Sequence, residues 1–322
     1  MTIRKMSRVS VCLTCYNESD FVEEAVRSVL RQTAADRIEQ IIIVDDGSTD
    51  RSPEKLQRLA EETGRILLVV QENRGLPAAR NRAMREATGD LIAFLDSDDI
   101  WHPSKIEKQI EGFADSTVGL VYSDYVDFFH KHLDEGMLVC VRRLSDRGPS
   151  LARDYYVKDA PIMPSTAVIR REVLETIGGF DEASRIGEDT DYWMRIVLAG
   201  FGVQHTPGGL AFKRRHQRNL TANLERFVSV FEQQTHKFAE QYSFLQPLVS
   251  RRLSRRYAKV AESLMANGRI ADSARYLLRA LRHDPGNPRG YIYALALPVY
   301  AIGGLGAVSS AKRVYHLLRQ RG

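Results

Sequence analysis

Leu91-Ile92-Ala93-Phe94-Leu95-Asp96-Ser97-Asp98-Asp99 is a run of five apolar residues that ends in an acidic cluster. A short apolar run of this kind predicts a strand buried on both faces. Its three carboxylates repel one another unless a positive charge gathers them or water surrounds them. Hard cations such as Mg²⁺ prefer oxygen ligands, and open parallel sheets present ligand sites at the carboxyl ends of their strands. The alternative is an acidic turn that is simply solvated, and the rest of the sequence has to distinguish this from a ligand site.

The composition is that of an ordinary globular protein, with 322 residues, 43% hydrophobic and 27% charged. This length suits one large α/β domain and a smaller appendage. The polar, basic start runs directly into an apolar strand, so we expect no signal peptide. Three cysteines (Cys12, Cys15 and Cys140) make no disulfide framework, and the first two share one apolar strand. We therefore predict reduced, packed thiols and a cytoplasmic protein.

Charge divides the chain unevenly. From Lys213 to the end there are 20 Lys and Arg against 6 Asp and Glu, a balance of +14. The first 212 residues carry 26 against 35, a balance of −9. An acidic front and a basic tail predict two regions with different roles, and we place them at 1–219 and 220–322.

Strands alternate with helices through the first hundred residues, which predicts a parallel, right-handed βαβ sheet. The expected strands are Val9–Thr14, Gln40–Val44, Ile66–Val70 and Leu91–Leu95, and the expected helices include Phe21–Leu30 and Pro77–Ala87. Further on, a helix should end near Ala114, and strands should cover Val118–Tyr122 and Ser165–Ile169. Residues 124–160 show a loose pattern, interpreted as irregular structure with short antiparallel strands. Glu188–Leu198 is an expected helix.

The tail shows only helical patterns. We expect a helix at Phe227–Tyr242 and an antiparallel pair at Tyr257–Asn267 and Ile270–Arg282, similar to one tetratricopeptide-type unit. One such unit cannot bury its own face, so it should lean on the first domain or on a partner. Ala294–Val308 is apolar but shorter than the roughly 20 residues of a spanning helix. It suits either a membrane interface or a buried terminal helix.

Four polar clusters follow the four consecutive strands, and all should face one rim of the sheet. They are Thr14 with Tyr16-Asn17, Asp45-Asp46, Asn73-Arg74-Gly75 with Arg80, and Asp96-Ser97-Asp98. An aromatic ring, hydrogen-bond acceptors, a cation and a metal site together suit a nucleoside diphosphate.

The motifs in this order resemble family 2 glycosyltransferases of the GT-A fold. They are Val-Ser-Val-Cys-Leu-Thr-Cys-Tyr-Asn, Ile-Val-Asp-Asp-Gly-Ser-Thr-Asp, Asn-Arg-Gly-Leu-Pro-Ala-Ala-Arg-Asn, Phe-Leu-Asp-Ser-Asp-Asp, Gly-Gly-Phe-Asp-Glu and Gly-Glu-Asp-Thr-Asp-Tyr-Trp-Met-Arg. The resemblance covers about residues 8–219, and departs where Thr14-Cys15 replaces a frequent Pro-Thr. It implies a Rossmann-like, mainly parallel sheet flanked by helices, followed here by an all-α segment.

The resemblance also implies roles at the nucleotide. Thr14, Tyr16 and Asp46 would hold the base, with Asp46 accepting a ring N–H. The supporting residues would be Asn17 and Glu18 at this end of the nucleotide, Arg80 near the base or diphosphate, and Ser97 within the D-x-D motif. The alternative for Arg80 is that it is an exposed helix arginine with no role in binding. Asp98 would be the direct metal ligand, for Mn²⁺ or Mg²⁺, while Asp96 contacts ribose and metal-bound water.

A second group of residues would carry the reaction. Glu188-Asp189 matches the acidic pair of the family, and Asp189 would be the general base, which implies inversion at the anomeric carbon. The alternative without catalysis is that Asp189 is an acidic residue of the first helical turn, where its charge interacts favourably with the helix dipole. Asp191 could take the capping role instead. His216 matches a position where many members of the family bring a histidine back to the metal or the diphosphate. Tyr192 and Trp193 should pack beneath the base, and Trp193 could instead line the acceptor subsite.

Other functions fit less well. A nucleotidyltransferase would need a Gly-rich loop after the first strand, and a Rossmann dehydrogenase would need G-x-G-x-x-G. A non-catalytic scaffold that acts through its helical tail is the remaining alternative, and the acidic residues argue against it. We expect no nucleic-acid binding, because the basic tail lacks interleaved aromatic platforms. The expected partners are a nucleotide-diphosphate sugar (UDP favoured), a saccharide or lipid-linked acceptor and an anionic membrane surface, with the enzyme peripheral at its cytoplasmic face.

Overall fold

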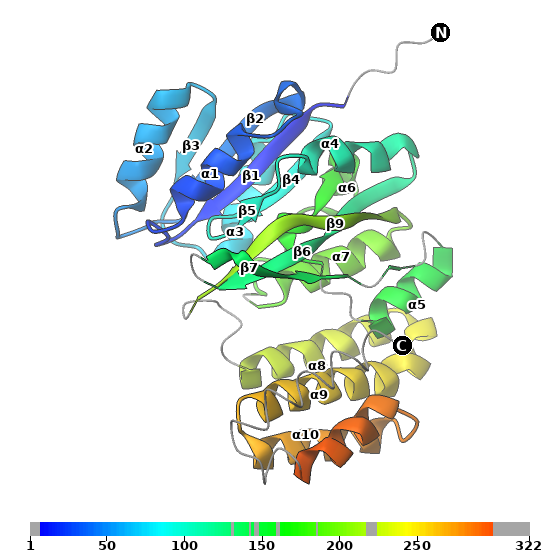
Figure 1. Cartoon of the computed structure of the whole chain (residues 1–322). Coiled ribbons are helices and arrows are strands. Elements are labelled where there is room, and N and C mark those ends of the chain that lie inside the picture. The colour runs from blue at the N-terminus through cyan, green and yellow to red at the C-terminus, as the bar shows by residue number, and fades with distance from the viewer. Residues whose placement is uncertain are drawn as a thin grey trace. The chain divides into compact units, whose positions relative to one another are not determined.

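The computed structural model describes residues 7–129, 132–141, 143–144, 148–158, 162–184, 186–216 and 224–298. The chain forms two compact units (Figure 1). The larger contains residues 1–155 and 160–223, and the smaller contains 156–159 and 224–322. The predicted domain boundary at 219/220 falls within 217–223, outside the described residues, and stays a prediction.

The larger unit is built on a sheet with the order β3-β2-β1-β4-β8-β6-β9-β5, and β7 pairs with β6. The described strands are β1 (Val9–Cys15), β2 (Ile38–Asp45), β3 (Ile66–Val70), β4 (Leu91–Asp96), β5 (Ile100–Trp101), β6 (Val118–Phe129), β7 (His132–Val139), β8 (Val168–Arg170) and β9 (Gly202–Arg215). Strands β3, β2, β1 and β4 are parallel. The pairs β4–β8, β8–β6, β6–β7 and β9–β5 are antiparallel, so the sheet is mixed beyond β4. The predicted α/β class is confirmed.

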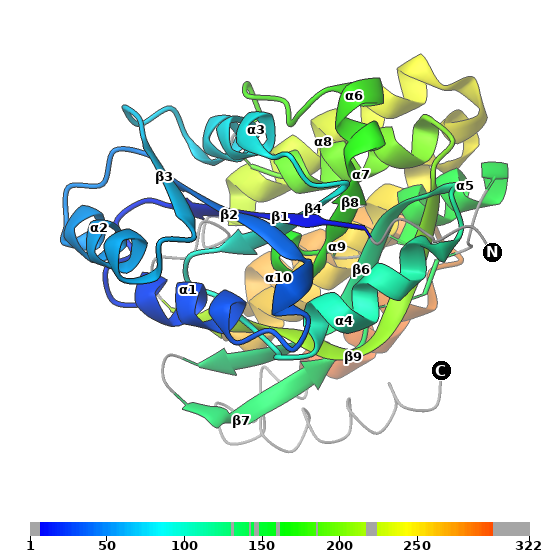
Figure 2. The ribbon, with the colours of Figure 1, turned by 90° about the horizontal axis from the view of Figure 1, so that it is seen from above.

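Helices cover both faces of this sheet. In Figure 2, α3 and α7 lie on one side, and α1 and α4 lie on the other. The described helices of this unit are α1 (Val22–Leu30), α2 (Ser52–Thr63), α3 (Leu76–Glu86), α4 (Lys105–Ile110), α5 (Gly148–Lys158, whose last residues belong to the smaller unit), α6 (Arg171–Ile177) and α7 (Glu188–Leu198). The first helix forms because its apolar residues recur on one face: Val22, Ala25, Val26 and Val29 are all buried.

Three sequence-based expectations need correction. Residues 124–160 are more regular than expected, because β6 extends to Phe129, β7 pairs with it, and 148–158 form α5. The expected strand Ser165–Ile169 is a 3₁₀ turn, Pro164–Thr166, followed by β8. The sequence also did not reveal β9, because Pro207-Gly208-Gly209 interrupts its pattern. Cys12 and Cys15 are packed as expected, but Cys140 is exposed.

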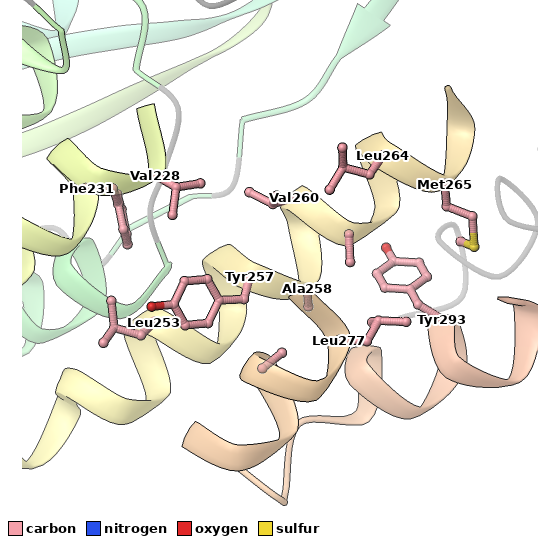
Figure 3. Close-up of a cluster of buried hydrophobic side chains, with 12 residues drawn as sticks. Val228, Phe231, Leu253, Tyr257, Ala258, Val260, Leu264, Met265, Leu277 and Tyr293 are labelled. Carbon is pink, nitrogen blue, oxygen red and sulfur yellow. The ribbon is translucent and has the colours of Figure 1, made fainter. Parts of the chain in front are cut away.

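The smaller unit has its own apolar core (Figure 3). Its described elements are α8 (Leu224–Gln241), a 3₁₀ helix Ser243–Leu248, α9 (Val249–Ala266), α10 (Ile270–His283) and helical residues 288–298. The predicted helix pair is confirmed in α9 and α10, with α9 beginning eight residues earlier than expected. Val228 and Phe231 of α8 enter the same core as Tyr257 and Leu277, so α8 covers the face that the pair cannot bury alone.

Two arginines of the basic tail are internal. Arg252 is 1% exposed, its Nε donates to Thr235 Oγ1 at 2.9 Å, and its guanidinium lies over the rings of Tyr156 and Phe231. Arg256 is 9% exposed and lies 4.1 Å from the Phe231 ring centroid. Neither side chain is solvated, so the charge of the tail overstates its surface charge. None of the helices in the described part of the chain has the length and apolar character needed to span a bilayer. Residues 299–308 of the apolar segment lie outside that part.

Candidate active site

Parallel pairing brings the first polar clusters together. Thr14 is in register with Val44 on one side and with Asp96 on the other, and Cys15 is in register with Asp45. The strands therefore end at one edge, as the motif order predicted. Thr14 and Ser97 are buried, and Tyr16 is 48% exposed.

The loops after β1 and β2 are tied to each other. Asn17, at φ 56°, accepts at its Oδ1 from the backbone N–H of Thr49 at 2.7 Å and of Asp50 at 3.3 Å. The Asn17 N–H donates to Ser48 Oγ at 2.9 Å, and the Glu18 N–H donates to Ser52 Oγ at 3.1 Å. These two residues thus shape the loop that carries the exposed Tyr16.

Asp46 is buried and holds the neighbouring loop. Its Oδ1 accepts from Gln71 Nε2 at 2.7 Å and from the Arg74 N–H at 2.9 Å, and its Oδ2 accepts from the Gly75 N–H at 2.8 Å. Gly47 allows the close approach, because a Cβ there would lie 2.8 Å from the Asn73 nitrogen. The resemblance implies that the Asp46 carboxylate binds the nucleotide base. The structure shows that the same carboxylate also holds the loop that contains Arg74 and Gly75.

Arg80 joins two motifs that are far apart in the sequence. It is 2% exposed, so the alternative of an exposed helix arginine is wrong. Its two terminal nitrogens lie 2.6 Å from Asp96 Oδ1 and 2.6 Å from Glu188 Oε1. Burial would lower the pKa of Arg80, but the charges of Asp96 and Glu188 outweigh it and raise the pKa above its ordinary value. A charged Arg80 therefore bridges the end of β4 and the start of α7.

Asn81, the next residue on α3, fixes the Gly-Gly-Phe-Asp-Glu turn. Its Nδ2 donates to the Phe180 carbonyl at 2.9 Å, and its Oδ1 accepts from the Phe180 N–H at 2.7 Å. A Cβ at Gly179 would lie 2.2 Å from Asn81 Oδ1, so only glycine fits there. The motif Ala-Ala-Arg-Asn is the signal that could have found this role, but the partner turn lies 99 residues away.

The acidic pair begins α7, with Glu188 buried and Asp189 half-buried. Gly187 precedes it at φ 71°, and Asp189 Oδ1 accepts from the Thr190 N–H at 2.6 Å. Burial raises the pKa of Glu188 to about 7, with Arg80 opposing and Asp189 adding to the shift. Burial also raises the pKa of Asp189, and the Arg80 charge opposes it. Asp191 Oδ2 accepts from Arg195 Nε at 2.8 Å, one turn further along the same helix.

Asp98 and His216 meet although 118 residues separate them, with His216 Nε2 at 3.0 Å from Asp98 Oδ2. Octahedral Mg²⁺ holds its ligands at about 2.0–2.1 Å, so two adjacent ligands lie about 3 Å apart. A carboxylate oxygen and an imidazole nitrogen at this separation fit two positions of such an ion. Within the described ranges, no three His, Cys, Asp or Glu side chains form a group that could hold a metal ion unaided. Diphosphate oxygens would therefore have to complete the set.

The two aromatic residues of α7 belong to the core. Tyr192 and Trp193 are fully buried, and Trp193 Nε1 donates to the Ile162 carbonyl at 2.9 Å. Phe180 packs on Tyr192 with 4.3 Å between ring centroids, and Phe94 meets Trp193 at 6.0 Å. The interpretation of Trp193 as an acceptor-subsite residue is wrong, because its side chain has no exposed surface.

A profile of the family described as glycosyl transferase family 2 matches residues 10–178. TuaG of Bacillus subtilis (strain 168), assigned by its name to teichuronic acid biosynthesis, is 41% identical over 67% of this chain and 82% of its own length. WfaP of Escherichia coli, a UDP-Glc:alpha-D-GlcNAc-diphosphoundecaprenol beta-1,3-glucosyltransferase, is 28% identical over 68% and 81%. The uncharacterised glycosyltransferase alr2836 of Nostoc sp. (strain PCC 7120) is 35% identical over 54% of each chain, so this match spans about half the length of that relative.

Solved structures show the same fold. The mannosyltransferase PcManGT from Pyrobaculum calidifontis, in complex with GDP-Man and Mn²⁺, has a TM-score of 0.60 at 21% identity over 95% of this chain and 87% of its own. S. aureus TarS residues 1–349 in complex with UDP-GlcNAc has a TM-score of 0.62 at 15% identity, covering 95% and 91%. With a matching profile over half of its length and a relative that is 41% identical, the chain belongs to glycosyl transferase family 2.

Proposed function

We propose that the protein is a metal-dependent, inverting glycosyltransferase that moves a hexose from a nucleotide-diphosphate sugar to an acceptor hydroxyl. The observation that carries this proposal is the bridge made by Arg80. It holds Asp96 of the D-x-D motif and Glu188 of the acidic pair on one buried cation, with Asp189 alongside. A nucleotide-binding edge and a candidate base are thereby held in one rigid arrangement.

Asp189 is the proposed general base. It would accept the proton of the acceptor hydroxyl while that oxygen attacks the anomeric carbon. Burial raises its pKa, which makes it a stronger base than a solvated aspartate. One carboxylate acting as a base, with no second carboxylate acting as nucleophile, corresponds to a single displacement and to inversion. Glu188 would act with it by keeping Arg80 in place.

Asp98 and His216 are the residues that would hold Mn²⁺ or Mg²⁺, with Asp96 near the ribose. When bound, the ion would neutralise the charge that grows on the departing diphosphate. The support is the 3.0 Å separation of the two donor atoms. It agrees with the Mn²⁺ named for PcManGT, which has a similar fold.

The donor is proposed to carry uracil, because TarS is named with UDP-GlcNAc and WfaP is named for UDP-Glc. Thr14, Tyr16 and Asp46 would receive the base. The acceptor is proposed to be a saccharide or a lipid-linked saccharide of cell-surface polysaccharide assembly, following the names of TuaG and WfaP. Hydrolysis of a panel of UDP-, GDP- and dTDP-sugars tests the proposal. Release of one nucleoside diphosphate that requires Mn²⁺ or Mg²⁺ is expected, and no hydrolysis or transfer from any donor would refute it.

We also propose that the segment 220–322 attaches the enzyme to an anionic membrane at its cytoplasmic face. Support comes from exposed apolar residues on two helices of the smaller unit. Leu278 of α10 is 57% exposed, and Tyr291, Ile292 and Leu295 of helix 288–298 are 51%, 47% and 79% exposed. Arg282 and Arg289 are exposed on the same two helices. Apolar residues with nearby arginines suit the headgroup region of an anionic bilayer.

A further inference from the structure

Arg214 of β9 is buried as deeply as a core residue. It is 2% exposed, although arginine is rarely buried unless its charge is satisfied. Its guanidinium carbon lies over two rings, 4.7 Å from the centroid of Phe21 and 4.6 Å from that of Phe128. Stacking of this kind holds a guanidinium plane in one orientation.

The polar atoms of Arg214 reach the acidic turn. Its Nε donates to the backbone carbonyl of Asp98 at 2.9 Å, and its own N–H donates to Asp99 Oδ1 at 3.1 Å. Asp99 is in turn fixed by Ser165, whose Oγ donates to Asp99 Oδ2 at 2.6 Å. The turn that carries Asp98 is therefore attached to β9 through both the backbone and the side chain of Arg214.

The other end of this attachment is His216, two residues further along. Its ring packs on Phe21 with 5.1 Å between centroids, and its Nε2 lies 3.0 Å from Asp98 Oδ2. Phe21 thus contacts both Arg214 and His216. Because Arg214 binds the main chain of Asp98 and precedes His216 by two residues, it joins the strand that leads to His216 to the turn that carries Asp98.

We infer that Arg214 is a positioning residue for the divalent metal: it holds Asp98 and His216 at ligand separation before the metal binds. The inference rests on the proposed metal-dependent function, since it assumes that Asp98 and His216 bind the ion. It assigns a role to a residue that supports the two candidate ligands and is not itself one of them. Hydrogen bonds behind the ligands of a metal commonly contribute 10–100-fold to affinity, and Arg214 supplies such bonds here.

The test measures the affinity of the full chain for Mn²⁺ by titration calorimetry, with and without UDP. Arg214→Lys retains a positive charge but loses the Nε donor and the flat stacking surface. We expect it to weaken Mn²⁺ binding about 10–100-fold. UDP binding in EDTA and the midpoint of thermal unfolding should change little. If the free energy of unfolding, or the affinity for UDP in EDTA, falls by as much as the affinity for Mn²⁺, Arg214 is a merely structural residue.

Two controls separate the contacts of Arg214. Its outer nitrogen also pairs with Glu24 at 2.5 Å, and the Glu24 side chain is 56% exposed. Glu24→Gln weakens that pair but leaves the bond to Asp98, so Mn²⁺ affinity should stay at the wild-type value. Arg215→Lys changes the neighbouring residue, which pairs with Asp127 at 2.8 Å, and should also leave it unchanged.

The outcomes are distinct. If Arg214→Lys does not fold, Phe128→Leu, which removes one stacking ring, should weaken Mn²⁺ binding in the same direction by a smaller factor. Wild-type Mn²⁺ affinity in Arg214→Lys, or in a folded Phe128→Leu tested in its place, overturns the inference and leaves the proposed function intact. An equal loss in Glu24→Gln also overturns it. If the wild-type chain itself binds no Mn²⁺ with UDP, both the metal assignment and the inference fail.

Discussion

Arg80 and Glu188 lie 2.6 Å apart, guanidinium nitrogen to carboxylate oxygen, although 108 residues separate them in the chain. The second carboxylate on the same guanidinium, Asp96, belongs to the acidic turn. A buried cation between two carboxylates satisfies charges that neither motif could bury alone. The relation therefore links the stability of the larger unit to the geometry of the candidate active site.

Removing Arg80 should destabilise the protein through the carboxylates it leaves behind. Arg80→Met should lower the free energy of unfolding by about 3–5 kcal/mol, the usual cost of breaking a buried ion pair. Adding Glu188→Gln should recover part of that loss, because it removes one uncompensated charge. Urea unfolding of the four proteins in this cycle measures the coupling. Simple addition of the two single losses would contradict the prediction. Arg82→Met, which breaks only a half-exposed pair with Glu86, is the control and should cost less than about 1 kcal/mol.

Asp189→Asn should separate chemistry from binding. We expect kcat to fall about 10²–10⁴-fold, the usual contribution of a general base, while affinity for the nucleotide sugar stays near normal. Single-turnover rates and donor titrations measure the two quantities. If donor affinity collapses while turnover at saturation is unchanged, Asp189 is a binding residue and the base lies elsewhere.

Metal dependence should follow Asp98. Asp98→Asn removes a charge with almost no change in volume, so the fold should persist while transfer is nearly abolished. Chelator treatment should have the same effect on the wild-type enzyme, and added Mn²⁺ should restore only the latter. Full activity of Asp98→Asn in chelator-treated buffer would exclude this metal assignment. Asp127→Asn, which weakens the Arg215 pair further along the sheet, should keep the wild-type metal requirement.

Lys105 should limit stability at neutral pH. It is fully buried, its Nζ has no hydrogen-bond partner among the described residues, and it lies 4.2 Å from the centroid of the Trp101 ring. Burial holds the pKa of Lys105 well below its ordinary value. The unfolded chain thus binds a proton that the folded chain does not, and stability falls as pH decreases below about 10.

Lys105→Met should therefore raise the free energy of unfolding at pH 7 by about 1–3 kcal/mol, because it removes a buried unsatisfied group. The gain should shrink toward pH 10, and unfolding measured between pH 7 and 10 records the trend. Lys108→Met, on the exposed side of the same helix, should have little effect at any pH. A Lys105→Met protein less stable than the wild type throughout would show that the ammonium–ring contact dominates.

Attachment to membranes should depend on the exposed apolar residues of helix 288–298. The full chain should sediment with vesicles rich in phosphatidylglycerol at low salt, and less so as salt screens the surface charge. Ile292→Ser with Leu295→Ser should abolish sedimentation without affecting hydrolysis of the nucleotide sugar. Val70→Ser, at a residue 64% exposed on β3, is the control. A full chain that ignores these vesicles at low salt would rule out attachment.

Local patterns in the sequence were enough for the parallel half of the sheet, for α7 and for the pair α9–α10, because burial there follows a period of two or of 3.6 residues along the chain. They were not enough for β9, whose Pro and Gly residues hide the alternation, or for α5. The order of the strands also predicted that Thr14 and Asp96 would meet at one edge, since parallel strands end together.

The sequence by itself determined which residues are candidates for the chemistry, because carboxylates, histidine and small turn residues stand in recognisable motifs. Only the tertiary structure decided which of them pair. That Arg80 binds Glu188, that Asn81 holds Phe180, and that His216 returns to Asp98 depends on contacts spanning about a hundred residues. Burial was equally hidden, since Arg80, Arg214 and Arg252 are charged residues whose sequence neighbours do not reveal the rings and carboxylates around them. The physical reason is that a charge can be buried only where the fold supplies its partners, and those partners come from other elements.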